Sequence, residues 1–160
     1  LLNIVILLCN NTCTQHQGDL PINTYIEGCT TPPCLLPQLQ DAIIRIVFKA
    51  PRVIHSMRTL ATAYLSMGIF VVPIPYDLGA NAVTCNFLDN TYCPVLDGEI
   101  VQYTLRMYIE SFFPTGTSVN IEFRVVDDRN QPLLCIRTGL RIIDPLQSRS
   151  NATLSIEDLE

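Results

Sequence analysis

The side chains of this chain that are best able to do chemistry are its cysteines. Seven of them stand at positions 9, 13, 29, 34, 85, 93 and 135, whereas the two histidines, His16 and His55, lie far apart. Zinc sites typically use a Cys-x-x-Cys pair or closely spaced histidines, and neither pattern occurs here. We therefore expect no metal site and expect the cysteines to form disulfide bonds.

The first cysteine closes an apolar N-terminal stretch. Residues 1–9 are almost all apolar, and the polar run Asn10-Asn11-Thr12 follows. This pattern resembles the apolar segment and small-residue end of a secretory signal peptide, and a short buried strand is the alternative interpretation. We predict that residues 1–9 are what is left of a signal peptide, so that Cys9 is removed and an even number of cysteines remains in an oxidising compartment.

The remaining six cysteines allow many sets of bridges, which their spacing narrows to three favoured pairs: Cys29–Cys34, Cys85–Cys93 and Cys13–Cys135. The first pair flanks the stiff, short loop Thr-Thr-Pro-Pro, and the second flanks a loop of hairpin size. The third pair is left to join the two ends of the domain. A bridge that closes so long a loop should stabilise the fold by about 4–5 kcal/mol in the chain-entropy model.

Two Asn-x-Thr sequences, at Asn10 and Asn151, are candidate glycosylation sites. Together with the cysteines they favour a secreted, extracellular protein or one of the lysosomal lumen.

Composition limits the class of protein further. The 160 residues suit one domain, and 48% hydrophobic against 16% charged residues exclude general disorder. The net charge is -5, Lys49 is the only lysine and the arginines are scattered, so we expect no nucleic-acid partner. No apolar run reaches the roughly 20 residues that span a bilayer.

Patterns typical of catalysis are missing from the sequence. It contains neither a Gly-x-Ser-x-Gly elbow nor a phosphate-binding glycine loop. His55 stands beside Ser56 without an acid nearby in sequence to orient it, and Asp127-Asp128 offers too few oxygen ligands for calcium. We therefore expect a protein that is not an enzyme and that carries no cofactor.

Period-two alternation of apolar and polar residues predicts half-buried strands over 41–49, 102–109, 119–125 and 134–142. Residues 52–67 are ambiguous, since the part from Arg52 to Leu65 suits either about one helical turn or a loop that enters a strand. The turn-forming segments Asp97-Gly98, Phe113-Pro114-Thr115-Gly116 and 127–132 separate the strands. From residue 145 the chain turns polar, and we predict a flexible tail over 145–160.

Six to eight strands at this spacing, held by three bridges, predict an all-β fold, an immunoglobulin-like antiparallel β-sandwich of two sheets, over residues 10–144. The chain has no tryptophan, so the usual tryptophan packed on an intersheet bridge is not present. The inner faces of the two sheets are expected to carry Ile46, Phe48, Tyr103, Leu105, Ile121, Phe123 and Ile136. Such side chains form either a closed core or the apolar wall of a cavity.

The order of several motifs resembles that of the ML, or lipid-recognition, domain family, and most closely its soluble Niemann-Pick type C sterol-carrier branch and the mite group-two allergens. The matching pieces span residues 13–143 and are Cys29-Thr-Thr-Pro-Pro-Cys34, Met67-Gly68 leading to Val72-Pro73-Ile74-Pro75, Cys85 to Cys93-Pro94, Gly98, Tyr103, Phe112-Phe113-Pro114, and Phe123 through Asp127-Asp128 to Cys135.

The resemblance implies the same three bridges and two sheets held apart to enclose a lipid. It implies an entrance on the Pro-rich segment and the aromatic-Pro turn, which here supply Phe70, Val72, Ile74, Ile109, Phe113 and Pro114. Where the sterol carrier has a tryptophan on the inner face, this chain has Phe123, and its aromatic-Pro turn has two phenylalanines, so the shape of the ligand is expected to differ.

The leading hypothesis is a secreted, monomeric carrier that binds a sterol, a fatty acid or a similar apolar lipid non-covalently and exchanges it with a donor or acceptor membrane or receptor. The alternative is a lipid-presenting subunit of an innate-immune or chemosensory receptor system. That role needs a basic rim, for which Arg52 and Arg58 are the candidates, although the acidic balance of the chain disfavours it. A plain adhesion sandwich with a filled core is the third possibility.

Overall fold

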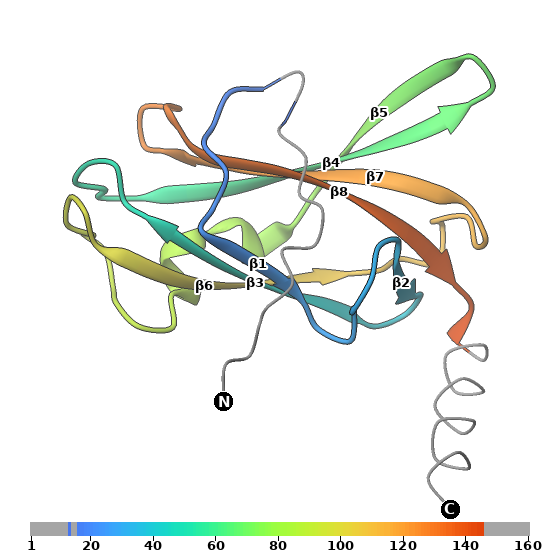
Figure 1. Cartoon of the computed structure of the whole chain (residues 1–160), viewed down its shortest axis with the longest axis horizontal. Helices are drawn as coiled ribbons and strands as arrows, with labels where there is room; N and C mark the ends of the chain where they lie inside the picture. The colour runs from blue at the N-terminus through green and yellow to red at the C-terminus, as the bar shows by residue number, and fades with distance from the viewer. Residues whose placement is uncertain (1–12, 14–15, 146–160) are drawn as a thin grey trace, which may run out of the picture.

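The computed structural model describes residue 13 and residues 16–145, and in this part of the chain eight strands form two facing sheets (Figure 1). The three-stranded sheet has the order β1 (Asn23–Ile26), β3 (Asp41–Lys49), β6 (Ile100–Tyr108). The five-stranded sheet has the order β2 (Cys34–Pro37), β8 (Pro132–Ile143), β7 (Ser118–Asp127), β4 (Met57–Met67), β5 (Phe70–Tyr76). Two short 3-10 turns, η1 (Gly79–Ala82) and η2 (Thr84–Phe87), connect β5 to β6 across the 85–93 bridge.

The predicted β-sandwich is confirmed, with one difference in strand direction. Every strand pair is antiparallel except β2 with β8, which run parallel from the pair Cys34 and Leu140 to the pair Pro37 and Ile143. Parallel neighbours need a long connection, and here the five strands β3 to β7 lie between β2 and β8 along the chain. Alternation of apolar and polar residues does not depend on the direction of the neighbouring strand, so the parallel pairing of β2 with β8 could not be predicted from the sequence.

The alternation in β3 shows why these residues form a half-buried strand. Ala42, Ile44, Ile46 and Phe48 are buried, whereas Asp41, Arg45 and Lys49 are exposed. Because successive side chains of a strand point to opposite faces, a period of two places all the apolar groups on the side that the other sheet covers. The predicted inner positions of β6, β7 and β8 are buried in the same way.

The ambiguous stretch at 52–67 is a loop that enters a strand, since β4 begins at Met57 and continues to Met67. Its pairing with β7, which places Ala61 opposite Phe123 and Ala63 opposite Ile121, decides for the strand. The helical-turn alternative is therefore wrong. Small alanines at these positions leave space for the larger side chains of the neighbouring strand.

All three predicted disulfide bonds are present. Cys13–Cys135 joins residues 122 positions apart, and Cys29–Cys34 and Cys85–Cys93 close loops of 5 and 8 positions. The long bridge ties the N-terminal segment to β8, the strand next to the edge strand β2 in the five-stranded sheet.

Some predictions fall outside the described residues: the signal-peptide interpretation of residues 1–9, the sequon at Asn10, the sequon at Asn151 and nearly all of the predicted tail. Among the residues that are described, no helix has both the length and the apolar character needed to cross a membrane.

Candidate functional site

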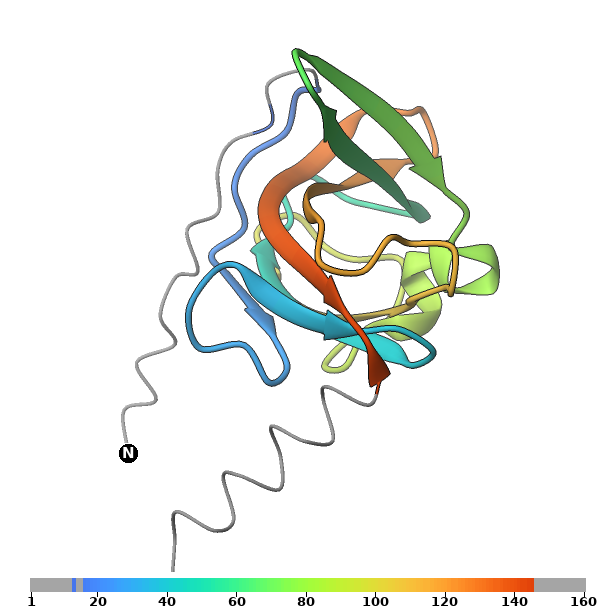
Figure 2. The same cartoon turned by 90° about the vertical axis from the view of Figure 1, so that its right-hand side faces the viewer.

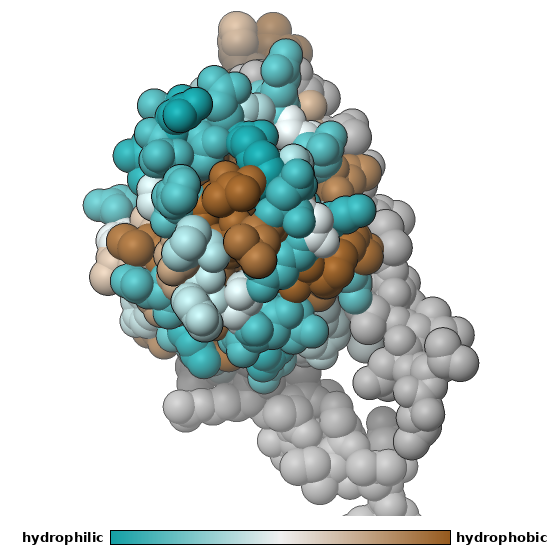
Figure 3. Space-filling view, turned by 90° about the vertical axis from the view of Figure 1, so that its left-hand side faces the viewer, coloured by the Kyte–Doolittle hydropathy of each residue, from teal (hydrophilic) through white to brown (hydrophobic). Residues whose placement is uncertain are grey.

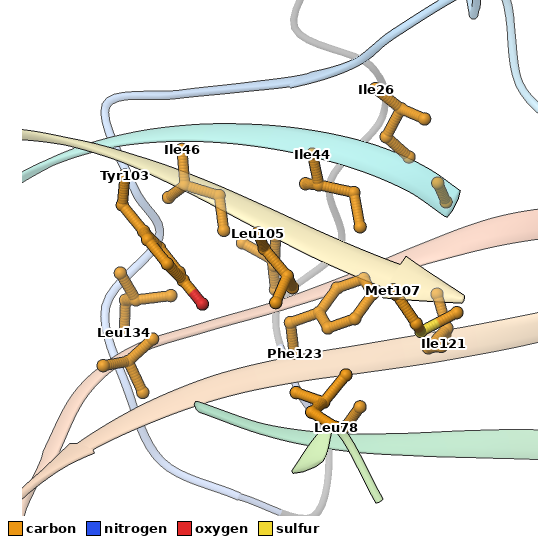
Figure 4. Close-up of a cluster of buried hydrophobic side chains, with 14 of the residues drawn as sticks. Ile26, Ile44, Ile46, Leu78, Tyr103, Leu105, Met107, Ile121, Phe123 and Leu134 are labelled. Atoms are coloured by element: carbon orange, nitrogen blue, oxygen red, sulfur yellow. The ribbon is translucent and has the colours of Figure 1, made fainter. Parts of the chain in front are cut away.

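The seven residues predicted for the inner wall lie on the two facing sheets and are all essentially inaccessible to water. Figure 4 shows Ile46, Tyr103 and Leu105 of the three-stranded sheet directed toward Phe123 and Ile121 of the five-stranded sheet. These residues belong to one continuous cluster of buried apolar side chains. The interior is therefore strongly apolar along the length of the sandwich.

The one tyrosine of this wall has its hydroxyl satisfied inside the protein. The Tyr103 hydroxyl lies 2.7 Å from Thr59 Oγ1, which lies 2.7 Å from Thr84 Oγ1 of η2. Burial raises the pKa of Tyr103 to about 12, because the phenolate would lose its hydration, and the hydrogen bonds with the two threonines offset only part of this effect. The phenol therefore stays neutral.

Half of the predicted entrance residues lie on β5, which is exposed along nearly all of its length. β5 and the end of β4 form a hairpin, residues 65–76, that projects from the sandwich (Figure 1). We call these residues the apolar hairpin, because they include no charged side chain. Ile69 at its turn is 93% exposed, Phe70 is 69% exposed, and Val72 and Ile74 are also exposed.

The other predicted entrance residues lie on the 109–117 loop, at the end of the sandwich that Figure 2 faces. Ile109 is buried and Pro114 is exposed, and of the two neighbouring phenylalanines Phe113 is 7% exposed and Phe112 is 68% exposed. Phe113 is thus the inward ring of the aromatic-Pro turn, a choice that the sequence left open.

Side chains from the two edges of the five-stranded sheet contact this loop. Gln38, which follows β2, donates from Nε2 to the carbonyl oxygens of Ser111 at 3.1 Å and Phe113 at 2.7 Å. On the other side the Tyr76 hydroxyl donates to the Tyr108 carbonyl oxygen at 2.6 Å, and the Tyr76 and Phe113 rings lie 5.5 Å apart. The base of the apolar hairpin is therefore joined to the loop, so the structure brings the two halves of the predicted entrance together.

A cleft of about 280 Å³ opens at this end of the sandwich, next to Ile109. Its lining includes the buried side chains of Leu36 and Ala42, and two carboxylates, Glu27 and Asp41, lie at its edge. Neither residue was among the predicted site residues, although the alternation over 41–49 had placed Ala42 on the inner face of its strand. Leu36 stands on the parallel strand β2, which carried too short an alternating pattern to be predicted.

A second cleft, of about 390 Å³, lies at the opposite end. Phe48 and Leu134 of the buried wall line it together with the exposed side chains of Leu20, Ile22 and Lys49. The face of the molecule at this end shows apolar patches interrupted by hydrophilic residues (Figure 3). This mixture contrasts with the apolar hairpin, where charged residues are missing over twelve positions in succession.

A buried polar cluster on the outer face of the five-stranded sheet was not predicted. Glu122 of β7 is 1% exposed, its Oε1 lies 2.6 Å from His16 Nδ1, and the Tyr64 hydroxyl donates to its Oε2 at 3.3 Å. Burial, followed by the nearby Glu122 carboxylate, raises the pKa of Tyr64. Arg137 stacks on the Tyr64 ring at 4.1 Å.

The N-terminal segment covers this cluster and reaches β8 through Gly18. A Cβ at Gly18 would lie 2.7 Å from the Leu134 carbonyl carbon, so only glycine permits the approach. The sulfurs of Cys13 and Cys135 lie within 4.8 Å of a Glu122 oxygen. Because these sulfurs are joined to each other, they are not available as metal-binding thiolates. The cluster holds the N-terminal segment onto the sheet.

Of the two arginines considered for a basic rim, Arg52 lies in the loop before β4 and Arg58 lies on β4 itself. Arg52 forms an ion pair with Asp127 at 2.9 Å, and Arg58 lies on β4 rather than in a loop, with Asn130 Oδ1 3.5 Å from its Nη2. The Asp127 carboxylate also accepts hydrogen bonds from the backbone N–H groups of Arg129 and Gln131. The geometry thus uses Arg52 to support the β7–β8 turn, at the end of the sandwich away from the apolar hairpin.

Taken together, the fold and the site define a disulfide-bonded, two-sheet β-sandwich with an apolar interior and an exposed apolar hairpin at one end. The family model of the ML domain matches residues 9–142, and the chain belongs to that family. ML domains of this kind are not enzymes, as the missing catalytic motifs predicted.

Two relatives are informative. NPC intracellular cholesterol transporter 2 of Danio rerio is 20% identical over 132 residues, which cover 82% of this chain and 83% of the relative. The crystal structure of a Niemann-Pick type C2 protein from the Japanese carpenter ant matches with a TM-score of 0.63 and 16% identity, and it covers 83% of this chain and 98% of the other. The second similarity confirms the fold.

Proposed function

We propose that this protein is a carrier that binds one apolar lipid non-covalently between its two sheets. The observation that carries the proposal is the continuous cluster of buried apolar side chains between the two sheets, in a chain of the ML family. The name of the zebrafish relative, a cholesterol transporter, favours a sterol as the ligand, and a fatty acid fits the same apolar chemistry. The carrier would keep its ligand out of water while it moves between membranes.

The entrance is proposed at the end that carries the apolar hairpin and the 109–117 loop. Phe70, Val72 and Ile74 are exposed there, and Ile109 and Phe113 lie just inside. The cleft beside Ile109 also opens at this end. A ligand that enters here meets Phe123 and Ile121, which we propose as part of the wall together with Tyr103.

The strength of binding can be bounded by the area of lipid that is buried. Removing roughly 400 Å² of apolar lipid surface from water contributes about 10 kcal/mol. Association costs of about 4–15 kcal/mol offset much of this gain. The result is an affinity near the micromolar range, which suits a carrier that must also release its ligand.

A secreted or lysosomal location is part of the proposal. Three disulfide bonds in a small domain are typical of oxidising compartments. Within this proposal residues 1–9 are the end of a signal peptide, the lipid-binding domain covers residues 10–144, and Asn10 and Asn151 are glycosylation acceptors. A receptor-presenting role is not proposed, since Arg52 is already paired with Asp127.

The test is organic extraction of the purified full chain, made in a secretory host, followed by mass spectrometry. We expect stoichiometric lipid. Phe123→Glu places a charge on the inner wall and should abolish uptake. Asn120→Glu, which adds the same charge to an exposed position of the same strand, should bind normally. Circular dichroism checks folding, and Phe123→Leu, which stays apolar, should fold and change the lipid profile. A folded Phe123→Glu variant that still takes up lipid would contradict the proposal.

A further inference from the structure

Within the described part of the chain, residue 13 and residues 16–145, two buried threonine hydroxyls have no hydrogen-bond partner. Thr24 on β1 is 1% exposed and Thr138 on β8 is 2% exposed, and the Oγ1 atom of each is unpaired. Other buried hydroxyls are satisfied, as in the group formed by Thr59, Thr84 and Tyr103. Because nearly all buried polar groups in proteins find a partner, an unpaired pair of hydroxyls calls for a physical reason.

Thr138 lies on the inner face of the five-stranded sheet. It alternates with the buried Ile136 and Leu140 and is paired in register with Ile121, which faces the other sheet in Figure 4. A cross-strand neighbour in an antiparallel pair has its side chain on the same face. The Thr138 hydroxyl is therefore held in the space between the sheets.

The same cross-strand row connects Thr138 to the proposed entrance. The register runs from Ile74 on β5 to Ala63 on β4, then to Ile121 on β7 and to Thr138 on β8. Ile74 is exposed and the other three are buried. Neighbouring strands lie about 4.8 Å apart, so the row spans about 14 Å from the edge strand β5 to β8.

The side chains of this row before Thr138 offer no polar atom. Ile74, Ala63 and Ile121 are purely aliphatic, so none of them can pair with the hydroxyl, whereas a polar atom of a molecule that lies along the row can. A charged group is a poor partner, because a buried ion needs a counter-charge. The counter-charge of a carboxylate is a cation, and the row of Ile74, Ala63, Ile121 and Thr138 contains none.

We propose that Thr138 hydrogen-bonds a hydroxyl or carbonyl oxygen at the buried end of the bound lipid and so selects lipids with a neutral polar atom at that end. The inference rests on the proposed lipid-carrier function. The lipid would lie along the Ile74–Thr138 row, and any charged headgroup would remain at the hairpin end, in water. A lipid with a purely apolar end leaves the hydroxyl unpaired and binds less tightly.

The experiment compares palmitic acid with ω-hydroxypalmitic acid, which differ only by a hydroxyl at the end remote from the carboxylate. Displacement of a fluorescent fatty acid gives both affinities for the full chain. We expect the native protein to prefer the ω-hydroxy acid by about five- to tenfold, the worth of one net hydrogen bond. Thr138→Val keeps the shape of the side chain and should remove this preference without loss of thermal stability.

Two control variants define what counts against the proposal. Ile136→Val, two residues away on the same face, should weaken both acids equally, and Thr24→Val, which removes the unpaired hydroxyl outside the row, should keep the preference. A preference that survives in Thr138→Val, or that disappears in Thr24→Val instead, overturns the assignment of Thr138 while the carrier function stands. A native protein that binds neither acid nor any sterol overturns the carrier function itself.

Discussion

Strand β4 runs through two regions that have similar composition and opposite exposure. From Met57 to Ala63 its alternate side chains are buried between the sheets, whereas its last residues pair with β5 in the exposed apolar hairpin. The first part faces the three-stranded sheet, and the second projects beyond it (Figure 1). Apolar character alone therefore does not distinguish a core from a contact surface, because an apolar strand becomes part of the core only where another element covers it.

The difference has an energetic meaning. Buried apolar groups in the sandwich stabilise the fold at roughly 25 cal/mol per Å² removed from water. The side chains of the apolar hairpin gain little of this stabilisation, and a contiguous exposed apolar surface usually marks a site of contact with another molecule. The sandwich should therefore control stability, and the hairpin should control exchange of the ligand.

The largest effect should come from the disulfide bond that anchors the sandwich. Replacing Cys13 and Cys135 by serine frees a loop of 122 residues and should cost about 5 kcal/mol, whereas replacing Cys29 and Cys34, separated by 5 positions, should cost about 2 kcal/mol. Urea unfolding of the two double variants measures both. Equal losses in the two variants would show that the length of the closed loop does not determine how much a disulfide stabilises this fold.

An effect of intermediate size is expected at high pH from Tyr103 in the sandwich interior. Its pKa is raised to about 12 by burial, while an unfolded tyrosine titrates near 10. The unfolded chain therefore loses its proton first, so this contribution is complete below pH of about 10 and is lost as the pH rises to about 12. The loss should approach 3 kcal/mol, since one pKa unit corresponds to about 1.4 kcal/mol.

Free energies of unfolding at about pH 9 and about pH 12 test this expectation. Tyr64 and Tyr76, whose pKa values burial also raises, add to the slope in the same direction. The difference between the native protein and Tyr103→Phe isolates the buried phenol. An alkaline slope that is unchanged in Tyr103→Phe would show that the interior is wetter than its packing indicates.

The inner wall was predictable because the signal for it is local. Alternation over 119–125 placed Ile121 and Phe123 inside, and both are buried. The same rule placed Glu122 in water, yet it is buried, because its partner His16 is 106 positions away and the N-terminal segment covers it. A segment that is distant in the sequence and covers a strand does not change the alternation pattern of that strand, so the burial of Glu122 could not be predicted from it.

The placement of the residues proposed for the entrance was only partly predictable. The motif positions located Phe70, Val72 and Ile74, and the structure places them on one exposed strand. The inward orientation of Phe113 rather than Phe112 depends on Gln38 and Tyr76, which reach the loop from opposite edges of the five-stranded sheet. Thr138 was correctly placed on an inner face by alternation, but the fact that its hydroxyl is unpaired emerges only when every neighbour is in place.

The smallest effect on stability, and the clearest contrast with the core, is expected for the apolar hairpin. The double variant Phe70→Thr, Val72→Thr keeps residues that favour strands and removes exposed apolar surface, so the free energy of unfolding should change by less than about 0.5 kcal/mol. Transfer of a fluorescent sterol between lipid vesicles should nevertheless slow several-fold. Tyr92→Thr, which removes an exposed ring away from the hairpin, should alter neither property. If the hairpin variant instead loses as much stability as a core variant, the hairpin is part of the folding core. The proposal that the sandwich controls stability and the hairpin controls ligand exchange would then be wrong.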